Sequence, residues 1–313
     1  MSNAGPSRRY DGRRYDQYRP LQIEIGELDR ADGSGRFGFG STAALASCSG
    51  PLEVRLNKEL PTRATLEISH RPLEGVGATP SRALVTTLES IFPTVLSLSS
   101  YPRSLIQLIV QSLSSSSTTL NSSTSSNYNP DIYIDIEPDN NEKNVWPQFG
   151  NKIKFEDDKS PNTSYPFSIR STSINSITLA CLDNSSIKMI NLPISISISY
   201  LINKGLIIDP TIQEENQSSS RFGFAWSFGK NIKVNVKKSI SKQDLKNKMD
   251  IEGEEDDNNN DQVEMELVWV ESEGKFTKEI FSDALELSKI ACRKILDEIR
   301  SKLGEKLENR KLQ

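Results

Sequence analysis

The alternation of apolar and polar residues in several short segments most narrowly limits what this chain can fold into. Residues 21–28 (LQIEIGEL), 64–72 (ATLEISHRP) and 192–201 (LPISISISYL) change character at every second position. This period places successive side chains on opposite faces of a β-strand. Further apolar runs of strand length lie at 104–113, 205–211, 221–228 and 264–272. The sequence therefore predicts sheets of short strands, in which 205–211 and 221–228 pair with 264–272.

Three other segments carry a helical pattern. Thr79 is predicted as an N-cap and Pro80 as the first residue of a helix that ends near Pro93 or a few residues beyond. A second helix is expected at 171–186, and a long amphipathic one at 277–307. The second helix is predicted to have one buried face, formed by Ile174, Ile177, Ala180 and Cys181. Strands interleaved with helices in this order predict a mixed α+β architecture.

Small residues crowd positions 30–55 (RADGSGRFGFGSTAALASCSGPLEVR). This stretch can be interpreted as a phosphate-binding glycine loop or as a sharply turning hairpin. A phosphate loop follows a strand and opens a helix, whereas the residues after Gly40 have the pattern of a strand closed by a turn at Gly50 and Pro51. We therefore favour a hairpin that turns at Asp32 and Gly33, a dipeptide common in tight turns.

Polar, low-complexity segments interrupt this pattern. Residues 114–130 are rich in Ser, Thr and Asn, and residues 230–262 hold a basic run followed by an acidic one. Such compositions bury too little apolar surface to offset the entropy lost on ordering. We therefore predict one domain at 19–309, with disordered insertions at about 114–165 and 230–262, preceded by a basic Arg/Tyr tail at 1–18.

Composition argues against several classes of protein. A net charge of −4 does not suit a general polyanion binder, and no apolar run approaches the roughly 18 residues of a membrane span. The N-terminus lacks the apolar region of a secretory signal. Cys48, Cys181 and Cys292 are widely spaced, which favours a reducing compartment over a disulfide framework or a zinc site. His70 is the only histidine and is expected to be structural. We expect no metal, no cofactor and no membrane contact.

Several motifs follow one another in a specific order. Residues 8–51 contain R-x-D-G-R, then R-P, a strand ending in Gly, RADGS, a G-x-T strand and G-P. The series continues with EVRLNKELPTRATLEISHRP, YPRSLIQLIVQ and SINSITLACLDNSSIKM, and it fades after LIIDPTIQEE. In this order the pieces resemble the ribonuclease PH superfamily. The resemblance implies a ribonuclease PH fold, built of β-α-β units like those of ribosomal protein S5 domain 2.

The resemblance implies one of two kinds of function. Some members are phosphorolytic exoribonucleases, in which inorganic phosphate attacks the terminal phosphodiester of RNA and releases nucleoside diphosphates. The ring subunits of the eukaryotic RNA exosome are mostly inert, and this chain resembles them at ELPTRATLEI and RPLEGVGAT. The implied partners are other RNase PH-like ring subunits, cap subunits, hydrolytic nucleases and single-stranded RNA. The implied location is the nucleus and nucleolus, and also the cytoplasm.

The phosphate-binding element of active members is altered in this chain. They hold phosphate on a Gly-Gly-Thr-Arg turn that leads into a helix, and the matching residues here are Phe167, Ser168, Ile169 and Arg170. Arg170 alone keeps its type, since Ser168 and Ile169 lack the backbone freedom of glycine. Arg170 is therefore either a remnant of the phosphate site or a surface arginine at a helix start.

The acidic and RNA-gripping elements are also reduced. Asp209, Glu214 and Glu215 match the opening of the family's acidic segment, but 218–221 (SSSR) replaces its second acidic cluster, so no general acid is expected. On the helix after the third strand, only Arg82 remains of the RNA-gripping arginines. The sequence thus predicts an inactive structural and RNA-channel subunit. The alternatives are a self-sufficient phosphate-dependent 3'–5' exoribonuclease and a different RNase PH-like ring subunit.

The N-terminal tail interleaves Arg and Tyr. Its arginines are candidate contacts to RNA phosphates, with Tyr10 and Tyr15 stacking on bases. A second interpretation gives Arg13 and Arg19 structural contacts. The complete set of candidate RNA-binding residues is Arg8, Arg9, Arg13, Arg14, Arg82 and Arg170.

Overall fold

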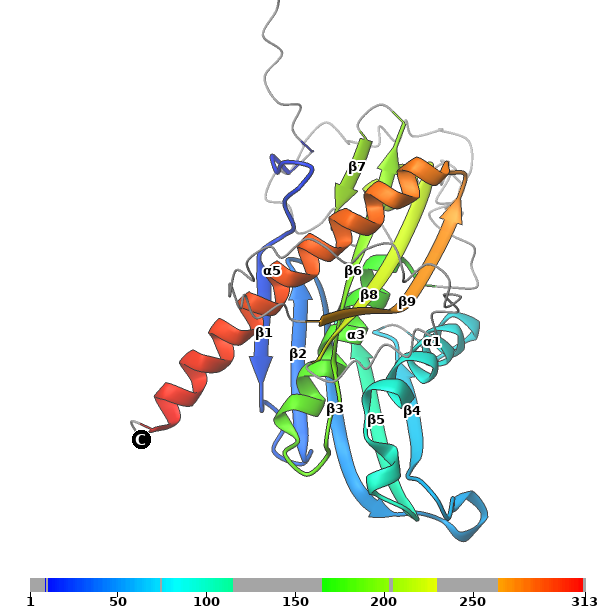
Figure 1. Ribbon diagram of the computed structural model, residues 1–313, viewed down its shortest axis with the longest axis vertical. Coiled ribbons are helices and arrows are strands. Elements are labelled where there is room, and N and C mark those ends of the chain that lie inside the picture. Colours follow the sequence, from blue (N-terminus) through cyan, green and yellow to red (C-terminus); the bar gives the residue numbers. More distant parts are fainter. Residues whose placement is uncertain are drawn as a thin grey trace, which may run out of the picture.

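The computed structural model describes residue 9 and residues 11–73, 75–114, 165–202, 205–229 and 264–311. Apart from their end residues Ser114 and Tyr165, the two predicted insertions lie outside the described residues, as does Arg8. The described chain forms two β-sheets with helices between and beside them (Figure 1).

The first sheet has five strands in the order β1-β2-β3-β5-β4. All neighbours are antiparallel except β4 and β5, which are parallel. A parallel pair needs a crossover, which helix α1 (Thr79–Val95) supplies between them. The strands are β1 (Leu21–Ile25), β2 (Gly33–Phe39), β3 (Thr42–Glu53), β4 (Thr65–Arg71) and β5 (Ser104–Ser112), with short 3-10 helices at Leu56–Lys58 and Leu98–Ser100.

The glycine-rich stretch forms strands, which confirms the hairpin interpretation over that of a phosphate loop. The predicted turn at Asp32 and Gly33 is wrong, because residues 26–32 connect β1 to β2 and Gly33 already pairs with Cys48. Residues 33–39, which we expected to belong to the turning segment, are strand β2 and pair with both β1 and β3. The glycines are needed because helix α3 (Phe167–Asp183) passes close to this strand. A Cβ on Gly35 would lie 2.5 Å from the Cβ of Leu179, much closer than two carbon atoms can approach.

The second sheet is antiparallel throughout and has the order β7-β6-β8-β9. The long helix α5 (Lys278–Lys311) packs on β6, β7 and β8, where its Ala284, Ala291 and Ile295 meet the isoleucines of β6. The predicted pairing of 221–228 with 264–272 is confirmed by β8 and β9. The predicted pairing of 205–211 with 264–272 is wrong, because β7 pairs with β6 at the opposite edge of the sheet. The elements are β6 (Leu192–Leu201), β7 (Gly205–Ile208), α4 (Ile212–Gln217), β8 (Ser220–Gly229) and β9 (Glu264–Gly274).

Helix α3 lies between the two sheets and is the centre of the fold (Figure 1). It contacts β2, β3 and β5 on one side and β6 and β8 on the other. Every residue from Phe167 to Cys181 is buried, so the prediction of a single buried face is wrong. The polar side chains on this helix bond inside the protein: Asn175, for example, pairs with the backbone of Ser195 through both its amide atoms, at 2.7 and 2.9 Å.

Helix α1 packs beside α3 on the first sheet. Its N-cap is Ala78 rather than Thr79, and no side chain caps it. Its end at Val95 agrees with the predicted end, because Leu96 leaves the helix in an extended conformation shortly after Pro93. No helix in the described parts of the chain has the length and apolar character needed to cross a membrane.

Candidate functional site

The first turn of α3, where active relatives would hold phosphate, is bonded to the chain's own groups. The backbone N–H of Phe167 donates to Glu215 Oε1 at 2.6 Å, and Ser168 donates to Oε2 from its N–H at 3.4 Å and its hydroxyl at 3.1 Å. The N–H groups of Ile169 and Arg170 both donate to the carbonyl of Pro166. Thus the N–H groups of the first turn, from Phe167 to Arg170, all have an acceptor within the protein, and Pro166 at the N-cap has no N–H to satisfy.

Glu215 reaches this helix start from α4 and is 1% exposed. Burial raises the pKa of its carboxyl above the usual value, and the bonds from Phe167 and Ser168 together with the charge of Arg221 oppose that shift. The positive end of the α3 dipole favours the ionised carboxylate at this position. Glu215 therefore occupies the position that an inorganic anion would take at a helix N-terminus.

Arg170 is 4% exposed, so the interpretation of a surface arginine is wrong. Its Nη1 lies 2.6 Å from the carboxylate of Glu271 on β9, and its Nε donates to the carbonyl of Tyr165 at 2.8 Å. The guanidinium also lies over the ring of Phe167, 4.6 Å from the centroid. These contacts engage its Nε and Nη1, and a phosphate or RNA contact of Arg170 stays a prediction.

Asp209, which follows β7, is bound by arginines of the N-terminal segment. Its carboxylate accepts from Arg19 at 2.6 Å through Nη2 and at 2.8 Å through Nε, and Arg13 Nη1 lies 3.4 Å away. Its backbone carbonyl accepts from Arg9 at 2.9 Å. Asp209 is completely buried, in the left-handed region at φ 48°. Arg19 thus occupies both carboxylate oxygens of Asp209.

Glu214 forms a second buried ion pair, with Arg9, whose Nε donates to its carboxylate at 2.9 Å and whose Nη2 also bonds to it. Thr211 and Glu214 form a capping box that starts α4. Burial alone would raise the pKa of Glu214, but the bonds from Arg9 and Thr211 lower it below its ordinary value. The three acidic residues that match the family's acidic segment thus have internal partners.

The arginines of the N-terminal segment differ in their burial. Arg9, Arg13 and Arg19 are buried in the ion pairs above, so the predicted structural contacts of Arg13 and Arg19 are present. Arg14 is exposed, as is Arg82 on α1. RNA binding by any residue of the candidate set stays a prediction. Sequence reasoning missed the pairing of Arg9 with Glu214, because nothing in the sequence relates two residues 205 positions apart.

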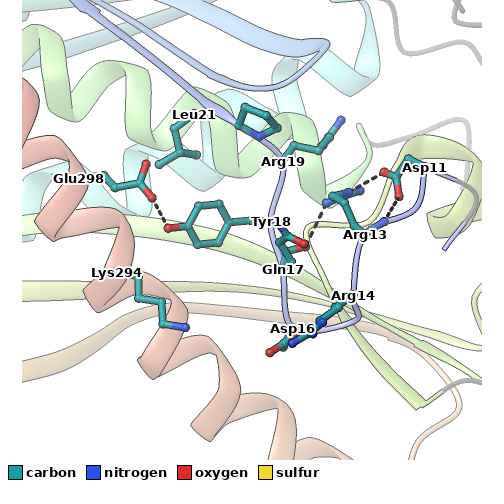
Figure 2. Close-up of a pocket in the computed structure, with 11 residues that line it drawn as sticks. Asp11, Arg13, Arg14, Asp16, Gln17, Tyr18, Arg19, Leu21, Lys294 and Glu298 are labelled. Atoms are coloured by element: carbon teal, nitrogen blue, oxygen red, sulfur yellow. Dashed lines mark hydrogen bonds and ion pairs between the residues drawn. The ribbon is translucent and has the colours of Figure 1, made fainter. Parts of the chain in front are cut away.

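The exposed residues of this segment line a pocket of about 850 Å³ in front of α5 (Figure 2). Arg14 and Asp16 lie on one side of it, and Lys294 and Glu298 extend from the helix on the other. The hydroxyl of Tyr18 donates to Glu298 across the gap. Burial and the carboxylate of Glu298 raise the pKa of Tyr18 well above its ordinary value.

The remaining candidates are structural. His70 is buried, with Nδ1 at 3.1 Å from the hydroxyl of Ser81 and Nε2 at 2.9 Å from that of Ser112. Burial lowers its pKa to about 4, so the imidazole is neutral at pH 7. The described residues contain no group of three or more His, Cys, Asp or Glu side chains that could hold a metal ion. Cys48 and Cys181, distant in sequence, meet in the core as free thiols with sulfurs 3.9 Å apart.

Solved structures share the fold of this chain. Rice Rrp46 matches with a TM-score of 0.63 at 19% identity, over 95% of this chain and 100% of that one. An archaeal exosome core matches with a TM-score of 0.54 at 13% identity, over 94% of this chain and 91% of that one. These likenesses confirm the expected α+β ribonuclease PH fold.

Sequence comparison identifies the family. The family model "3' exoribonuclease family, domain 1" (RNase PH) matches residues 17–185, and the chain belongs to this family. The exosome complex component RRP46 of Saccharomyces cerevisiae is 39% identical over 95 residues, which are 30% of this chain and 43% of that protein. Its Schizosaccharomyces pombe counterpart is 33% identical over 87 residues, 28% of this chain and 38% of that protein. The chain spans less than half the length of these curated relatives.

Proposed function

We propose that this chain is a non-catalytic ring subunit of an RNA exosome core. It supports 3'–5' RNA processing and degradation as a structural and RNA-channel subunit and does not itself cleave RNA. The observation that carries the proposal is the closed first turn of α3. Its N–H groups are bonded to Glu215 and Pro166, and the arginine at the family's phosphate position is paired with Glu271.

Phosphorolysis requires two anions, inorganic phosphate and the RNA backbone, to lie side by side. Such a site needs several fixed donors that are free to bind phosphate oxygens. For phosphate to bind at α3, Glu215 would have to leave a buried position in which it accepts three hydrogen bonds. Asp209 and Glu214 are bound by arginines, so neither is available as a general acid. These contacts support a structural role for the chain.

The named relatives supply the rest of the proposal. Two are exosome components called RRP46, and the first-named structural match is rice Rrp46. By analogy, the partners are other RNase PH-like ring subunits, cap subunits, hydrolytic nucleases and single-stranded RNA. The processes are ribosomal RNA maturation, mRNA turnover and RNA surveillance. The location is the nucleus and nucleolus, and also the cytoplasm.

Purification of the tagged protein from its own cells at mild salt tests this assignment. Equal amounts of several other RNase PH-like chains, with cap subunits and a hydrolytic nuclease, are expected beside it. A homo-oligomer without those chains would contradict the proposal.

A second candidate function is phosphate-dependent exoribonuclease activity. It is favoured by the name of one relative, the rice "Exosome complex exonuclease RRP46 homolog", which is 31% identical over 103 residues, 33% of this chain and 43% of that protein. This alternative requires the isolated chain to release nucleoside diphosphates from RNA when phosphate is added. It also requires the activity to fall when Arg170 is replaced by Ala, whereas a structural subunit releases none.

A further inference from the structure

Two thiols from distant parts of the chain meet where strand β3 packs against helix α3. Cys48 lies on β3 and Cys181 near the end of α3, and their sulfurs are 3.9 Å apart. Neither residue belongs to the candidate site described above. Two sulfurs at this separation are in contact, and a disulfide requires them to approach to about 2.05 Å. The pair is therefore a dithiol placed for bond formation.

The packing around the pair holds β3 and α3 close together. Ala44, Ala46 and Cys48 alternate along one face of β3, and all three belong to the core cluster that includes Cys181. The two alanines leave room for the helix to approach the strand. Gly33 pairs with Cys48 across β2 and β3, and a Cβ on it would lie only 2.6 Å from a backbone nitrogen at the end of α3. The contact between the thiols therefore follows from the way these elements pack.

The two thiols differ in the hydrogen bonds that they make. Cys181 donates to the sulfur of Cys48, and the side-chain amide of Asn184 donates to the same sulfur at 3.5 Å. The bond from Cys181 lowers the pKa of Cys48 below its ordinary value, against the effect of burial, and Asn184 adds to this shift. Donation to Cys48 and burial together raise the pKa of Cys181. Because the thiolate is the reactive form, Cys48 is the nucleophile of the pair and Cys181 the resolving thiol.

The pair lies at the last turn of α3, under a single side chain. Asn184 is the C-cap of the helix, and its amide also donates to the carbonyl of Gly50 at 3.4 Å. Leu182, the neighbour of Cys181, is exposed, although both thiols are buried. Helix ends open locally at a lower free energy than the centre of a core does. A small, neutral oxidant therefore needs only a local opening of this turn to reach Cys48.

We propose that Cys48 and Cys181 form a reversible disulfide when the protein meets hydrogen peroxide. The Cys48 thiolate attacks one peroxide oxygen and the O–O bond breaks, which gives a sulfenic acid and a hydroxide that takes up a proton. The sulfur of Cys181 then attacks the sulfenic sulfur, the S–S bond forms, and the hydroxyl leaves with the Cys181 proton as water. The two thiols lose two electrons in total, and one peroxide becomes two waters. An added thiol reverses the bond by exchange.

The bond would join the first sheet to the helix at the centre of the fold. It would close a covalent loop between residues 133 positions apart, and cross-links that close long loops restrict the unfolded chain most. The thiols are free in the structure, as expected of a resting state in a reducing compartment. The inference does not depend on the proposed function, since it concerns the fold of this chain alone.

Mass spectrometry of the tagged protein, purified from its own cells, tests the proposal. The folded protein is treated with dilute hydrogen peroxide and then unfolded, and its free thiols are alkylated before digestion. We expect a linked pair of peptides that hold Cys48 and Cys181, lighter by two hydrogens than the separate peptides and released by dithiothreitol. Cys292 is the internal control, because it is equally buried but donates to the carbonyl of Ile194 rather than to a second thiol. It should be modified at least tenfold more slowly.

Oxidation of Cys292 at the same rate as Cys48 would overturn the inference, as would recovery of Cys48 and Cys181 as alkylated thiols after the treatment. Electrophoresis without reductant gives a second readout, because the closed loop makes the unfolded chain more compact and faster in the gel. Cys292→Ala should keep this shift after peroxide treatment, and Cys181→Ala should lose it. An equal shift in Cys181→Ala, or none in Cys292→Ala, would also overturn the inference. Either result leaves the proposed function standing.

Discussion

Glu215 on α4 accepts a 2.6 Å hydrogen bond from the backbone N–H of Phe167, the first residue of α3. The pair joins the acidic segment after β7 to the helix at the centre of the fold. In place of an inorganic anion, a carboxylate of the chain faces the positive end of α3. This contact therefore serves the stability of the fold, and its energy can be measured.

Replacing Glu215 by Gln should destabilise the protein. The amide keeps the size of the side chain but loses the charge that faces the helix start, and its NH₂ group lies against N–H donors. Loss of a charge-assisted, buried hydrogen bond costs about 1–3 kcal/mol. Urea unfolding measures the change, and Glu89→Gln on the exposed face of α1 is the control. Equal midpoints for the two variants would contradict the role given to Glu215.

Asp209→Asn should be more damaging. Asn tolerates the left-handed backbone of this residue, so the substitution isolates the loss of charge. It leaves the buried guanidinium of Arg19 without its ionic partner, and breaking a buried pair costs about 3–5 kcal/mol. Asp16→Asn, at an exposed site, should stay within about 0.5 kcal/mol of the wild type. Thermal and urea unfolding of both variants separate the two expectations.

His70 should make stability depend on pH in the mildly acidic range. Its pKa is lowered by burial from 6.5 to about 4, so the folded state resists the proton that the unfolded state binds. Stability conferred by the neutral imidazole is complete above pH 6.5 and decreases as the pH falls toward 4. Because the chain has one histidine, His70→Gln should flatten the slope of unfolding free energy between pH 5 and 6.5. An unchanged slope would assign the pH dependence to other groups.

Gly35→Ala tests the close approach of β2 to α3. The added methyl group would meet the Cβ of Leu179 at 2.5 Å, and overpacking of this kind costs about 1–3 kcal/mol. Gly304→Ala on α5 meets no atom within 4 Å and should instead stabilise its helix by about 0.5–1 kcal/mol. Unfolding experiments on the two variants should give changes of opposite sign, and a neutral Gly35→Ala would contradict the packing argument.

Strand periodicity was the most reliable guide to the fold. Strand β6 was placed correctly because Ile and Ser alternate along 192–201. Both of its faces are buried all the same, since α5 covers the isoleucines and α3 the serines. Helix α3 shows the limit of such patterns. Its polar side chains return to the preceding turn, as Ser173 does to the carbonyl of Ile169 at 2.8 Å, and so they tolerate burial on every side.

The candidate site was less accessible to sequence reasoning. Loss of the Gly-Gly-Thr-Arg turn could be read directly at positions 167–170. The role of Glu215 could not be predicted from the sequence. No sequence pattern relates a carboxylate in α4 to the backbone of Phe167. Arg9 lies in a segment whose composition is typical of a solvated tail. Only the tertiary fold brings it into contact with Glu214. Long-range ion pairs of this kind depend on tertiary packing and leave no local signal.

The most direct test of the central claim is a phosphorolysis assay on the purified chain. Single-stranded RNA labelled at its 5' end would be incubated with and without inorganic phosphate. The length of the labelled RNA and the amount of unlabelled nucleoside diphosphate released from its 3' end would both be measured. An inactive subunit releases none under either condition, and Arg170→Ala makes no difference. Phosphate-dependent shortening of the RNA that is abolished by Arg170→Ala would contradict the account and identify the chain as an enzyme.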